Sequence, residues 1–344
     1  MNKVAVVILN WNGKELLEKL LPILIQNTPT EIDIILGDNA STDDSIAFVN
    51  SNFPRIQILE NERNLGFAEG YNKILERVDT DYFILLNSDV EVSPHWVEPI
   101  IKYLDENPEV AVAQPKILSY FDRESFEYAG AAGGYMDSLG YFFCRGRIFD
   151  SLEKDLGQYD NTLPVFWASG AAFFIRSKQF KDIGGFDPSL FAHMEEIDLC
   201  WRLQRQGHKI AFIPSSTVYH MGGQTLHLQN AQKTYLNFRN NLIILYKNLD
   251  ADCRYKILIK RFFMDFLAWL HFLFLFKWNH SWAISRAHWD FLKLKKNYMC
   301  QGSKKDHKAL DYTHNLPGYY PRSLVWEYYF LKKNKFSELF KASS

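Results

Sequence analysis

The sequence contains few cysteines, and their spacing argues against a cysteine-based metal site. Its 344 residues include only Cys144, Cys200, Cys253 and Cys300, which form no CxxC or Cys/His pattern with the spacing of metal ligands. We therefore expect reduced thiols and a cytoplasmic location. The sequence also lacks internal repeats and low-complexity segments, and 47% of its residues are apolar, so we expect a compact protein.

The apolar stretches lack the features of a leader or a membrane-spanning helix. Residues 4–9 give only six apolar positions with no small-residue cleavage site after them, so we expect a strand there rather than a signal peptide. The intensely apolar segment 255–278 contains no uncharged window of about 20 residues, the length that a spanning helix needs. Four charged or titratable residues interrupt it: Lys260, Arg261, Asp265 and His271.

The small net charge of −1 hides a difference between two regions. Residues 230–344 carry 20 Lys/Arg against 8 Asp/Glu, a net charge of +12, which leaves −13 for residues 1–229. From residue 230 onward the pattern is also helical and aromatic. We therefore predict a first domain over 1–229 and a basic, aromatic helical region over 230–344, each with its own partners.

Short runs of β-branched and aliphatic residues recur along the first region with helical spacing between them. They lie at 4–10, 32–39, 56–61, 82–89 and 110–117. Strands that are apolar on both faces and alternate with helices predict an α/β fold with a mostly parallel sheet covered on both sides. The leucine stripe in 13–27 and the capping residues 41–44 indicate two of the helices.

The second half of this region is less regular. We expect an irregular, Gly-rich aromatic stretch over about 119–165, a strand over 165–176 and a loop over 184–191. A helix over about 195–206 and a strand over 209–220 should follow.

Polar residues follow three of the predicted strands. Asn10 ends the first strand, Asp38-Asn39 the second and Asn87-Ser88-Asp89 the fourth. Such residues favour turns, but ligands of open α/β sheets bind at the carboxyl ends of the strands, so three endings on one rim indicate a site. The turn Asn64-Leu65-Gly66 opens a further helix and would let the backbone approach a ligand closely.

Eight motifs in order resemble one family. They are "VVILNWNG", "DNASTDDS", "NLGFAEGYN", "LLNSDV", "SGAAFFIR", "GGFDPSLF", "EEIDLCWR" and "VYHMGG". Over about residues 3–245 the sequence resembles the inverting family 2 glycosyltransferases, particularly their rhamnosyltransferase-like branch. The resemblance implies the GT-A (Rossmann-like) fold and transfer of a sugar from a nucleotide-diphosphate sugar.

The resemblance also implies residues that bind the donor. Asp38 would accept a hydrogen bond from the pyrimidine imide, and the backbone around Asn10 and Trp11 would line the base. Without the resemblance, Asp38 is equally well explained as a helix cap. Trp167 and Gly170 would lie beside the sugar, with core packing as the alternative for Trp167.

Asn87-Ser88-Asp89 falls where the family carries its DxD motif. Asp89 is therefore the expected ligand of Mg²⁺ or Mn²⁺, which would neutralise charge on the departing diphosphate. Asn87 replaces the first Asp of the motif, which removes one negative charge and puts strict metal dependence in question. His220 matches a position that supplies a further metal or diphosphate contact in some relatives, with a structural role as the alternative.

The catalytic base of the family falls on Glu196, and Glu195 precedes it. Inverting attack by an acceptor hydroxyl needs one carboxylate to take the proton, and assignment between these two glutamates is open by one residue. The alternative is that both acids, with Asp198, lie in the first helical turn only because the helix dipole favours acidic residues there. Arg145 and Arg147 would either meet a phosphate or lie in a solvated loop.

The expected partners follow from the same resemblance. They are a dTDP- or UDP-sugar donor and a saccharide or lipid-linked acceptor of cell-surface polysaccharide synthesis, with no nucleic acid. The basic aromatic region suits either an amphipathic helix on the inner face of the cytoplasmic membrane or a hairpin packed on the first domain or in a homodimer. A nucleotidyltransferase or a non-catalytic nucleotide-sugar-binding protein on the same fold is the alternative function.

Overall fold

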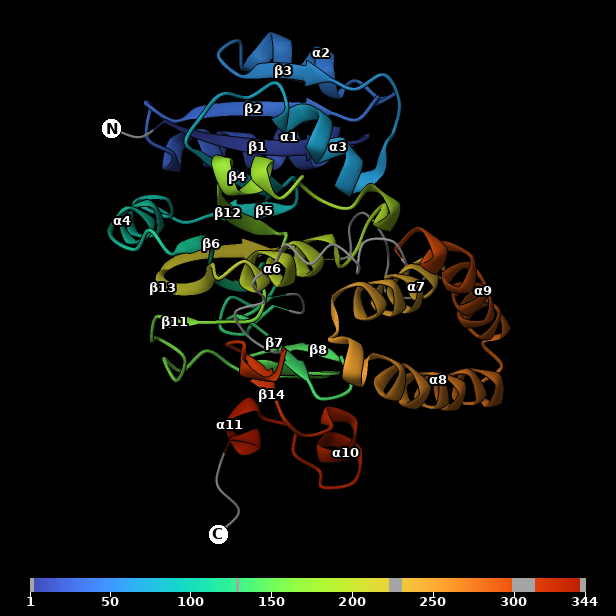
Figure 1. The fold of residues 1–344 in the computed structure, drawn as a ribbon. Coiled ribbons are helices and arrows are strands. Elements are labelled where there is room, and N and C mark those ends of the chain that lie inside the picture. Colours follow the sequence, from blue (N-terminus) through green and yellow to red (C-terminus); the bar gives the residue numbers. More distant parts are fainter. Residues whose placement is uncertain (1–2, 128–129, 223–230, 299–312, 341–344) are drawn as a thin grey trace.

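The computed structural model describes residues 3–127, 130–222, 231–298 and 313–340. Within these residues, nine strands form a main sheet in the order β11-β13-β6-β12-β4-β1-β2-β3, with β5 paired to β13. Figure 1 shows this sheet from β3 at the top down to β11. Its strands are β1 (Val4–Asn10), β2 (Asp33–Asp38), β3 (Gln57–Glu60), β4 (Tyr82–Asn87), β5 (Val90–Val92), β6 (Val110–Ser119), β11 (Leu163–Pro164), β12 (Ala172–Arg176) and β13 (Lys209–His220).

Helices cover both faces of the main sheet, as expected. Alternate residues of β1 and β4 point to opposite faces, where two separate apolar clusters form. One cluster contains side chains of α1 (Lys14–Asn27), α2 (Ser45–Asn52) and α4 (Glu98–Glu106). The other contains side chains of α3 (Gly66–Leu75), α5 (Ser177–Asp182) and α6 (Glu195–Arg205).

The sheet is mixed. The predicted parallel pairing holds for β3-β2-β1-β4 and for β6 with β13. Between these two blocks, β12 runs antiparallel to both β4 and β6. The predicted α/β fold is thus confirmed, and β12 is the strand that joins two parallel blocks.

The single strand predicted over 165–176 is wrong. Only β12 and the short β11 are strands of the sheet, and residues 166–170 between them leave it. The backbone of this segment finds other partners: Trp167 and Phe166 pair with Gly134, and the Ser169 N–H donates to Gln114 Oε1 at 2.8 Å. These bonds replace the ladder that a continuous strand would have needed.

A second, five-stranded sheet lies beside the main one in the described chain, in the order β10-β9-β8-β7-β14. The stretch predicted to be irregular supplies four of its strands, and β14 comes from near the end of the chain. The bounds are β7 (Gly134–Asp137), β8 (Phe142–Cys144), β9 (Arg147–Ile148), β10 (Ser151–Leu152) and β14 (Tyr319–Tyr320).

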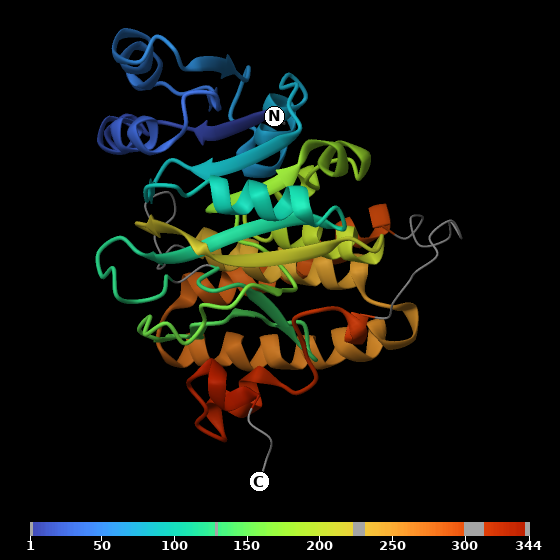
Figure 2. The ribbon, with the colours of Figure 1, turned by 90° about the vertical axis from the view of Figure 1, so that its left-hand side faces the viewer.

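The C-terminal region is mainly helical, as predicted. Figure 2 shows α8 along its length below the sheets. The predicted boundary at 229/230 lies outside the described residues, and the division into two domains stays a prediction. In the described ranges no helix combines the length and the apolar character needed to cross a bilayer. The helices are α7 (Ala231–Asn248), α8 (Ala251–Phe274), α9 (Trp278–Leu294), α10 (Leu324–Tyr329) and α11 (Phe336–Leu339).

Candidate active site

The polar endings of three strands meet on one rim, as the sequence predicts. Asn10 of β1 is in register with Asp38 of β2, and Leu9 is in register with Asn87 of β4. Backbone hydrogen bonds of 2.8 Å continue the pairing beyond the strands, from Asn39 N to the Asn10 carbonyl and from Asn61 N to the Asp38 carbonyl. The carboxyl edge of the sheet therefore carries a row of amides and carboxylates.

Asp38 is fully buried and anchors the loop before α2. Its Oδ2 accepts the Ser41 N–H at 2.8 Å, and its Oδ1 accepts Ser41 Oγ at 2.6 Å and Asn10 Nδ2 at 3.0 Å. The Asn10 Oδ1 is buried and has no hydrogen-bond partner in the described chain, while Trp11 next to it is half exposed. Asp38 does not cap α2, because the N-cap of that helix is Asp44 and its first N–H, from Ser45, donates to Asp43 Oδ1 at 3.1 Å. The contact of Asp38 with a base stays a prediction.

The turn before α3 is tied to the loop before α6. Asn64 Oδ1 accepts bonds from Asn39 Nδ2 and from the Gly66 N–H, and Gly66 has a φ of +75°. A Cβ at Gly66 would lie 2.5 Å from the ring of Phe191. The first N–H groups of α3, from Phe67 and Ala68, donate to the Phe191 carbonyl at 2.7 and 3.1 Å. Glycine is therefore required here for close packing of two loops.

Asp89 and His220 form a buried ion pair. Asp89 Oδ1 lies 3.1 Å from His220 Nε2, and Glu127 Oε1 lies 3.3 Å from the other ring nitrogen, Nδ1. Burial lowers the pKa of His220, but the two carboxylates outweigh it and raise that pKa to about 10. Burial likewise opposes ionisation of Asp89, yet His220 holds the pKa of this carboxyl below its usual value. Asp89 and His220 meet because β5 pairs with β13. This register sets His220 opposite Val90, the residue that follows Asp89.

Glu195, which is buried, and Glu196, which is half-buried, form a pair at the start of α6, and Oε2 of each is shielded from solvent. Burial raises the pKa of Glu196 to about 7, although backbone N–H groups, including that of Gly170, lower it. Burial and the neighbouring Glu196 together raise the pKa of Glu195 well above its usual value. In the described part of the chain no hydrogen-bond partner reaches Oε2 of either glutamate. Buried polar atoms without partners are rare in proteins and indicate a place that a ligand completes.

The acid pair lies next to the end of β4. The Asn87 N–H donates to the Ala171 carbonyl at 3.0 Å, and a Cβ on the preceding Gly170 would lie 3.9 Å from the Glu196 carboxyl carbon. Asp89 follows Asn87 by two residues. The predicted site residues from β4, β12 and α6 are therefore neighbours.

The loop that leads into the acid pair has an unusual backbone. Phe191, His193 and Met194 have φ values of 63°, 69° and 73°, in the left-handed region that side chains with a Cβ disfavour. His193 is half-buried, and its Nε2, which is shielded from solvent, has no hydrogen-bond partner among the described residues. Burial and Lys233 lower its pKa to about 4, so its ring is neutral at pH 7.

Helix α7 holds this loop in place, and sequence reasoning missed the residues responsible. Asn240 Nδ2 lies 2.7–3.0 Å from the carbonyl oxygens of Leu190, Ala192 and His193, and Arg239 Nη2 donates to the Leu190 carbonyl at 2.9 Å. The sequence signal that could have identified them is the presence of Arg239 and Asn240 in an otherwise apolar helical stretch, "FRNNLIIL".

Asp198 takes no part in the acid pair. Its Oδ2 lies 2.7 Å from Arg202 Nε and 2.9 Å from Lys247 Nζ, and its Oδ1 accepts Asn248 Nδ2 at 2.8 Å. Burial opposes ionisation, but these cations keep the pKa of Asp198 below its usual value. Asp198 therefore ties α6 to α7.

Residues 5–173 match the family model described as "Glycosyl transferase family 2". These residues form a glycosyl transferase family 2 domain. The protein is therefore a glycosyltransferase, and the alternatives of a nucleotidyltransferase or a non-catalytic binding protein are not retained.

Curated relatives of this glycosyltransferase support the rhamnosyltransferase-like branch. It is 26% identical to an N-acetylglucosaminyl-diphospho-decaprenol L-rhamnosyltransferase of Mycobacterium tuberculosis, over 63% of this chain and 75% of the relative. It is 20% identical to the low-salt glycan biosynthesis hexosyltransferase Agl10 of Haloferax volcanii, over 71% of this chain and 75% of the relative.

Solved structures of other glycosyltransferases share the fold. GalNAc-T7 with UDP, GalNAc and Mn²⁺ is similar with a TM-score of 0.53 and 17% identity, over 70% of this chain and 52% of that one. The mannosyltransferase PcManGT from Pyrobaculum calidifontis, with GDP-Man and Mn²⁺, is similar with a TM-score of 0.52 and 12% identity, over 88% and 79% of the two chains. The expected GT-A fold is thus confirmed.

Two further residues of the glycosyltransferase lie in its interior. Trp167 is 5% exposed, and its indole N–H donates to the Tyr135 carbonyl at 3.0 Å, so the geometry is that of core packing and its contact with a sugar stays a prediction. Arg145 is neither in a solvated loop nor open to a phosphate. Its buried guanidinium donates to the Ala132 carbonyl at 3.0 Å and to Asn161 Oδ1 at 2.9 Å.

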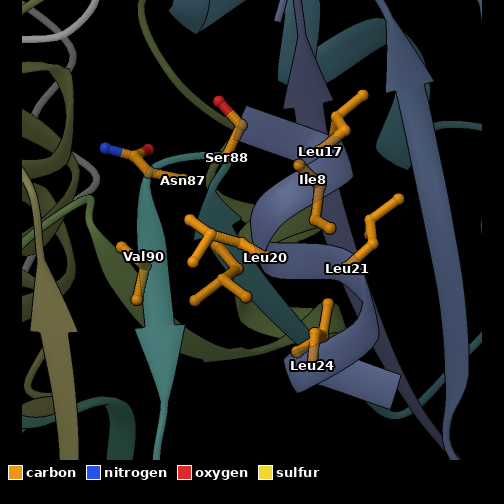
Figure 3. A pocket seen from close by; sticks show the side chains of 9 residues that line it. Ile8, Leu17, Leu20, Leu21, Leu24, Asn87, Ser88 and Val90 are labelled. Carbon is orange, nitrogen blue, oxygen red and sulfur yellow. The ribbon is translucent and has the colours of Figure 1, made fainter. Parts of the chain in front are cut away.

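A small cavity near Asn87 and Ser88 is not the donor site. It has a volume of about 10 Å³, roughly the space of one water molecule. Figure 3 shows the leucines of α1 lining it, with Asn87 and Ser88 at its polar end. The cavity is a packing gap between α1 and the sheet.

Proposed function

We propose that this glycosyltransferase inverts the anomeric configuration of the sugar that it transfers from a nucleotide-diphosphate donor. The observation that supports the proposal is the glutamate pair beside the rim, with raised pKa values and two shielded oxygens that have no hydrogen-bond partner among the described residues. A general base is most efficient when its pKa lies near the working pH, and a pKa of about 7 meets this condition.

Glu196 is the proposed base. Its carboxylate takes the proton of the acceptor hydroxyl as the oxygen attacks the anomeric carbon from the side opposite the diphosphate. The proton ends on the Glu196 carboxyl, the bond from the anomeric carbon to the diphosphate breaks, and the electron pair of that bond leaves with the nucleoside diphosphate. The backbone N–H of Gly170 favours the ionised form of Glu196 and fixes its direction.

The residues around Asp89 fit a divalent cation such as Mg²⁺ or Mn²⁺. The described chain contains no group of three or more acidic, His or Cys side chains arranged to hold a metal unaided. Asp89 Oδ1 and His220 Nε2 face each other at 3.1 Å, and Glu127 beside Nδ1 can orient the ring. We propose these two atoms as the protein ligands, and His220 would bind only after its ring loses the proton that it holds in the ion pair. Oxygens of the diphosphate and water would supply the other ligands. When bound, the cation would neutralise charge on the leaving diphosphate.

The donor is proposed to lie along the rim. Trp11, half exposed beside Asn10, offers a face for the base, and the unpartnered Asn10 Oδ1 can accept from its imide. Asp38, Asn64 and Gly66 hold the loops of this part of the site, and Asn87 and Ser88 lead to the diphosphate. A dTDP- or UDP-sugar fits this arrangement.

The acceptor is proposed to be a saccharide on a lipid carrier, reached at a membrane surface. The name of the mycobacterial relative, a rhamnosyltransferase acting on a decaprenol-linked sugar, supports this choice. A role in cell-surface polysaccharide synthesis agrees with the lipid-linked acceptor and with the name of this relative.

The test is the anomeric configuration of the product. A panel of dTDP- and UDP-sugars of known configuration is offered with a lipid-linked saccharide, and the linkage is read by NMR. An α-linked donor should give a β-linked product. A product that keeps the donor configuration would exclude Glu196 as the base of a single displacement.

A further inference from the structure

Two charged residues of α8 are turned inward. Arg261 and Asp265, which interrupt the apolar segment in the sequence, are 3% and 1% exposed. Arg261 stacks over the ring of Tyr141 at 3.7 Å and donates to the Gly140 carbonyl, while Asp265 Oδ2 lies 3.0 Å from His288 Nε2 of α9. Both charged side chains thus have partners of complementary charge or polarity inside the protein.

The outward side of α8 is apolar instead. Tyr255, Ile259, Phe263 and Phe266 follow one another at intervals of four, four and three residues, which places them on one face of the helix. Their exposed fractions are 62%, 70%, 62% and 52%. A soluble helix normally has the opposite arrangement, so this face indicates a partner.

The aromatic surface continues through the turn into α9. Phe274 and Phe276 at the turn are 76% and 78% exposed, and Trp278, Trp282 and Trp289 of α9 are 60–72% exposed. Tryptophan combines an apolar ring with a polar N–H, which suits the boundary between lipid and water.

The charges on this surface are nearly all positive. Lys256, Lys260 and Lys277 are exposed, and none is paired with an acidic side chain in the described chain. From residue 251 to residue 294, all of it described, Asp252 is the only exposed acidic residue. Asp290 is half-buried and bound to Tyr235 Oη at 2.9 Å.

We propose that the outward face of α8, the turn 275–277 and α9, here called the hairpin face, docks on the surface of an anionic lipid bilayer. This inference rests on the proposed function, because it gives the place where a lipid-linked acceptor is met. The rings enter the interface, and the lysines meet anionic headgroups.

A bilayer fits the hairpin face better than a second copy of the chain does. A two-fold dimer brings the same patch of each copy together, so the three lysines would meet three lysines with a single acid to offset them. An anionic bilayer has the complementary charge and needs no matching shape.

The hairpin face is joined to the acid pair through α7. Leu236 of α7 packs with Ala283 and Ala287 of α9 in one apolar cluster. The same helix holds the loop before Glu195 through Asn240. Docking would therefore place the acid pair at a fixed height above the bilayer.

The test is cosedimentation of the full-length protein with vesicles of phosphatidylcholine alone or mixed with phosphatidylglycerol. We expect binding to the anionic vesicles that weakens from 50 to 300 mM salt, and little binding to the neutral ones. The variant F263S/F274S/W282S should lose on the order of tenfold or more in affinity. K256Q/K260Q/K277Q should bind more weakly at low salt and lose most of the salt dependence.

The matched control is L152S/L156S. Both leucines are exposed, by 51% and 84%, and they lie in β10 and shortly after it, outside the hairpin face. Their substitution should leave vesicle binding unchanged. The oligomeric state of each variant is measured in parallel by sedimentation velocity.

A protein that ignores anionic vesicles at 50 mM salt overturns the inference. So does a dimer that F263S/F274S/W282S converts to a monomer without any change in vesicle binding. Neither result depends on donor binding. The proposed sugar transfer is tested separately, by the anomeric configuration of the product.

Discussion

At the scale of single residues, the central feature is a pair of glutamates held where carboxylates ionise with difficulty. Burial raises the pKa of both, and Oε2 of each lacks a partner in the described chain. A purely structural role in the helix dipole would not require burial, because acids at a helix start interact favourably with the N-terminus when exposed. The cost of burying the pair is better explained by catalysis.

Glu196→Gln is expected to lower turnover on the order of 10²–10⁴-fold while nucleotide binding is kept. Wild-type turnover should rise with pH through about 7 and then level off, because only the ionised Glu196 accepts a proton. Steady-state kinetics from pH 5.5 to 8.5, with nucleotide binding measured by calorimetry, checks this. Glu195→Gln is the matched control. A loss confined to Glu195→Gln would move the base to that residue.

Glu196→Gln should also change how the free energy of unfolding depends on pH. The pKa of Glu196 is higher in the folded chain than in the unfolded one, so the folded state holds more protons and wild-type stability falls as pH rises from about 4.5 to about 7. Glu196→Gln should therefore be more stable than wild type at pH 8, on the order of 2 kcal/mol, with little gain at pH 4.5. Urea unfolding at the two pH values measures the difference, and an equal effect at both would contradict it.

Asp89→Asn is expected to abolish the rise in melting temperature that Mn²⁺ adds to the effect of a nucleoside diphosphate. Asp89 Oδ1 is the carboxylate oxygen nearest His220 Nε2, and an amide is a weaker ligand for a hard cation. The control is Asp81→Asn, at the opposite end of β4, where the carboxylate accepts the Lys3 N–H at 2.7 Å. A full Mn²⁺ increment in Asp89→Asn would exclude Asp89 as a ligand.

At the scale of elements, α7 is part of the active site although it lies after the family domain in sequence. Three left-handed residues in one short loop are unfavourable unless other groups hold them. The Asn240 amide does so by donating to three carbonyl oxygens, and the Phe67 and Ala68 N–H groups of α3 hold the loop from the other side.

Asn240→Ala is expected to lower kcat at least about tenfold with little change in the KM for the donor, because Glu196 would lose its position but not its chemistry. Asn241→Ala is the control on the same helix, since Asn241 Nδ2 donates to the Gly140 carbonyl on the side of the second sheet. Asn240→Ala removes more buried hydrogen bonds than Asn241→Ala does, so its stability should fall further, and kcat is compared at a temperature where both variants are folded. Equal kcat values for the two would show that Asn240 does not position the base.

The sequence predicted the elements whose periodicity is strong. The apolar runs of β1, β2 and β4 and the leucine stripe of α1 are local signals, and the polar rim follows from parallel strands ending together. The second sheet was not predicted, because β9, β10 and β14 are two residues long and β14 pairs with β7 across more than 180 residues. Such pairing carries no local signal.

Which side chains face inward in α8 was also beyond the sequence. Arg261 and Asp265 interrupt an apolar run and would ordinarily be placed toward water. Their burial depends on Tyr141, Gly140 and His288, which come from other elements. The same holds for Arg145 and Trp167, whose polar groups find carbonyl partners only in the folded chain.

At the scale of the whole molecule, the two regions of opposite charge share one apolar core. The larger cluster contains Val7 and Phe83 of the main sheet together with Leu242 of α7 and Leu324 of α10. β14 completes the second sheet beside β7, and the Leu324 N–H donates to Asp137 Oδ2 at 2.8 Å. The charge difference therefore marks two surfaces of one core.

A chain truncated after residue 229 is therefore expected not to fold as a cooperative unit. It would expose the apolar side of α6, leave Asp198 buried without Lys247 and Asn248, and remove Asn240 from the loop before Glu195. Asp198 would keep only Arg202 as a charged partner. The loss of partners of a buried charge and a large exposed apolar face each destabilise a domain, together by several kcal/mol. Calorimetry should show no sharp transition for 1–229, in contrast to the full chain. A sharp transition with intact nucleotide binding would mean that residues 1–229 are an independent domain, and that α7 acts on the acid loop only.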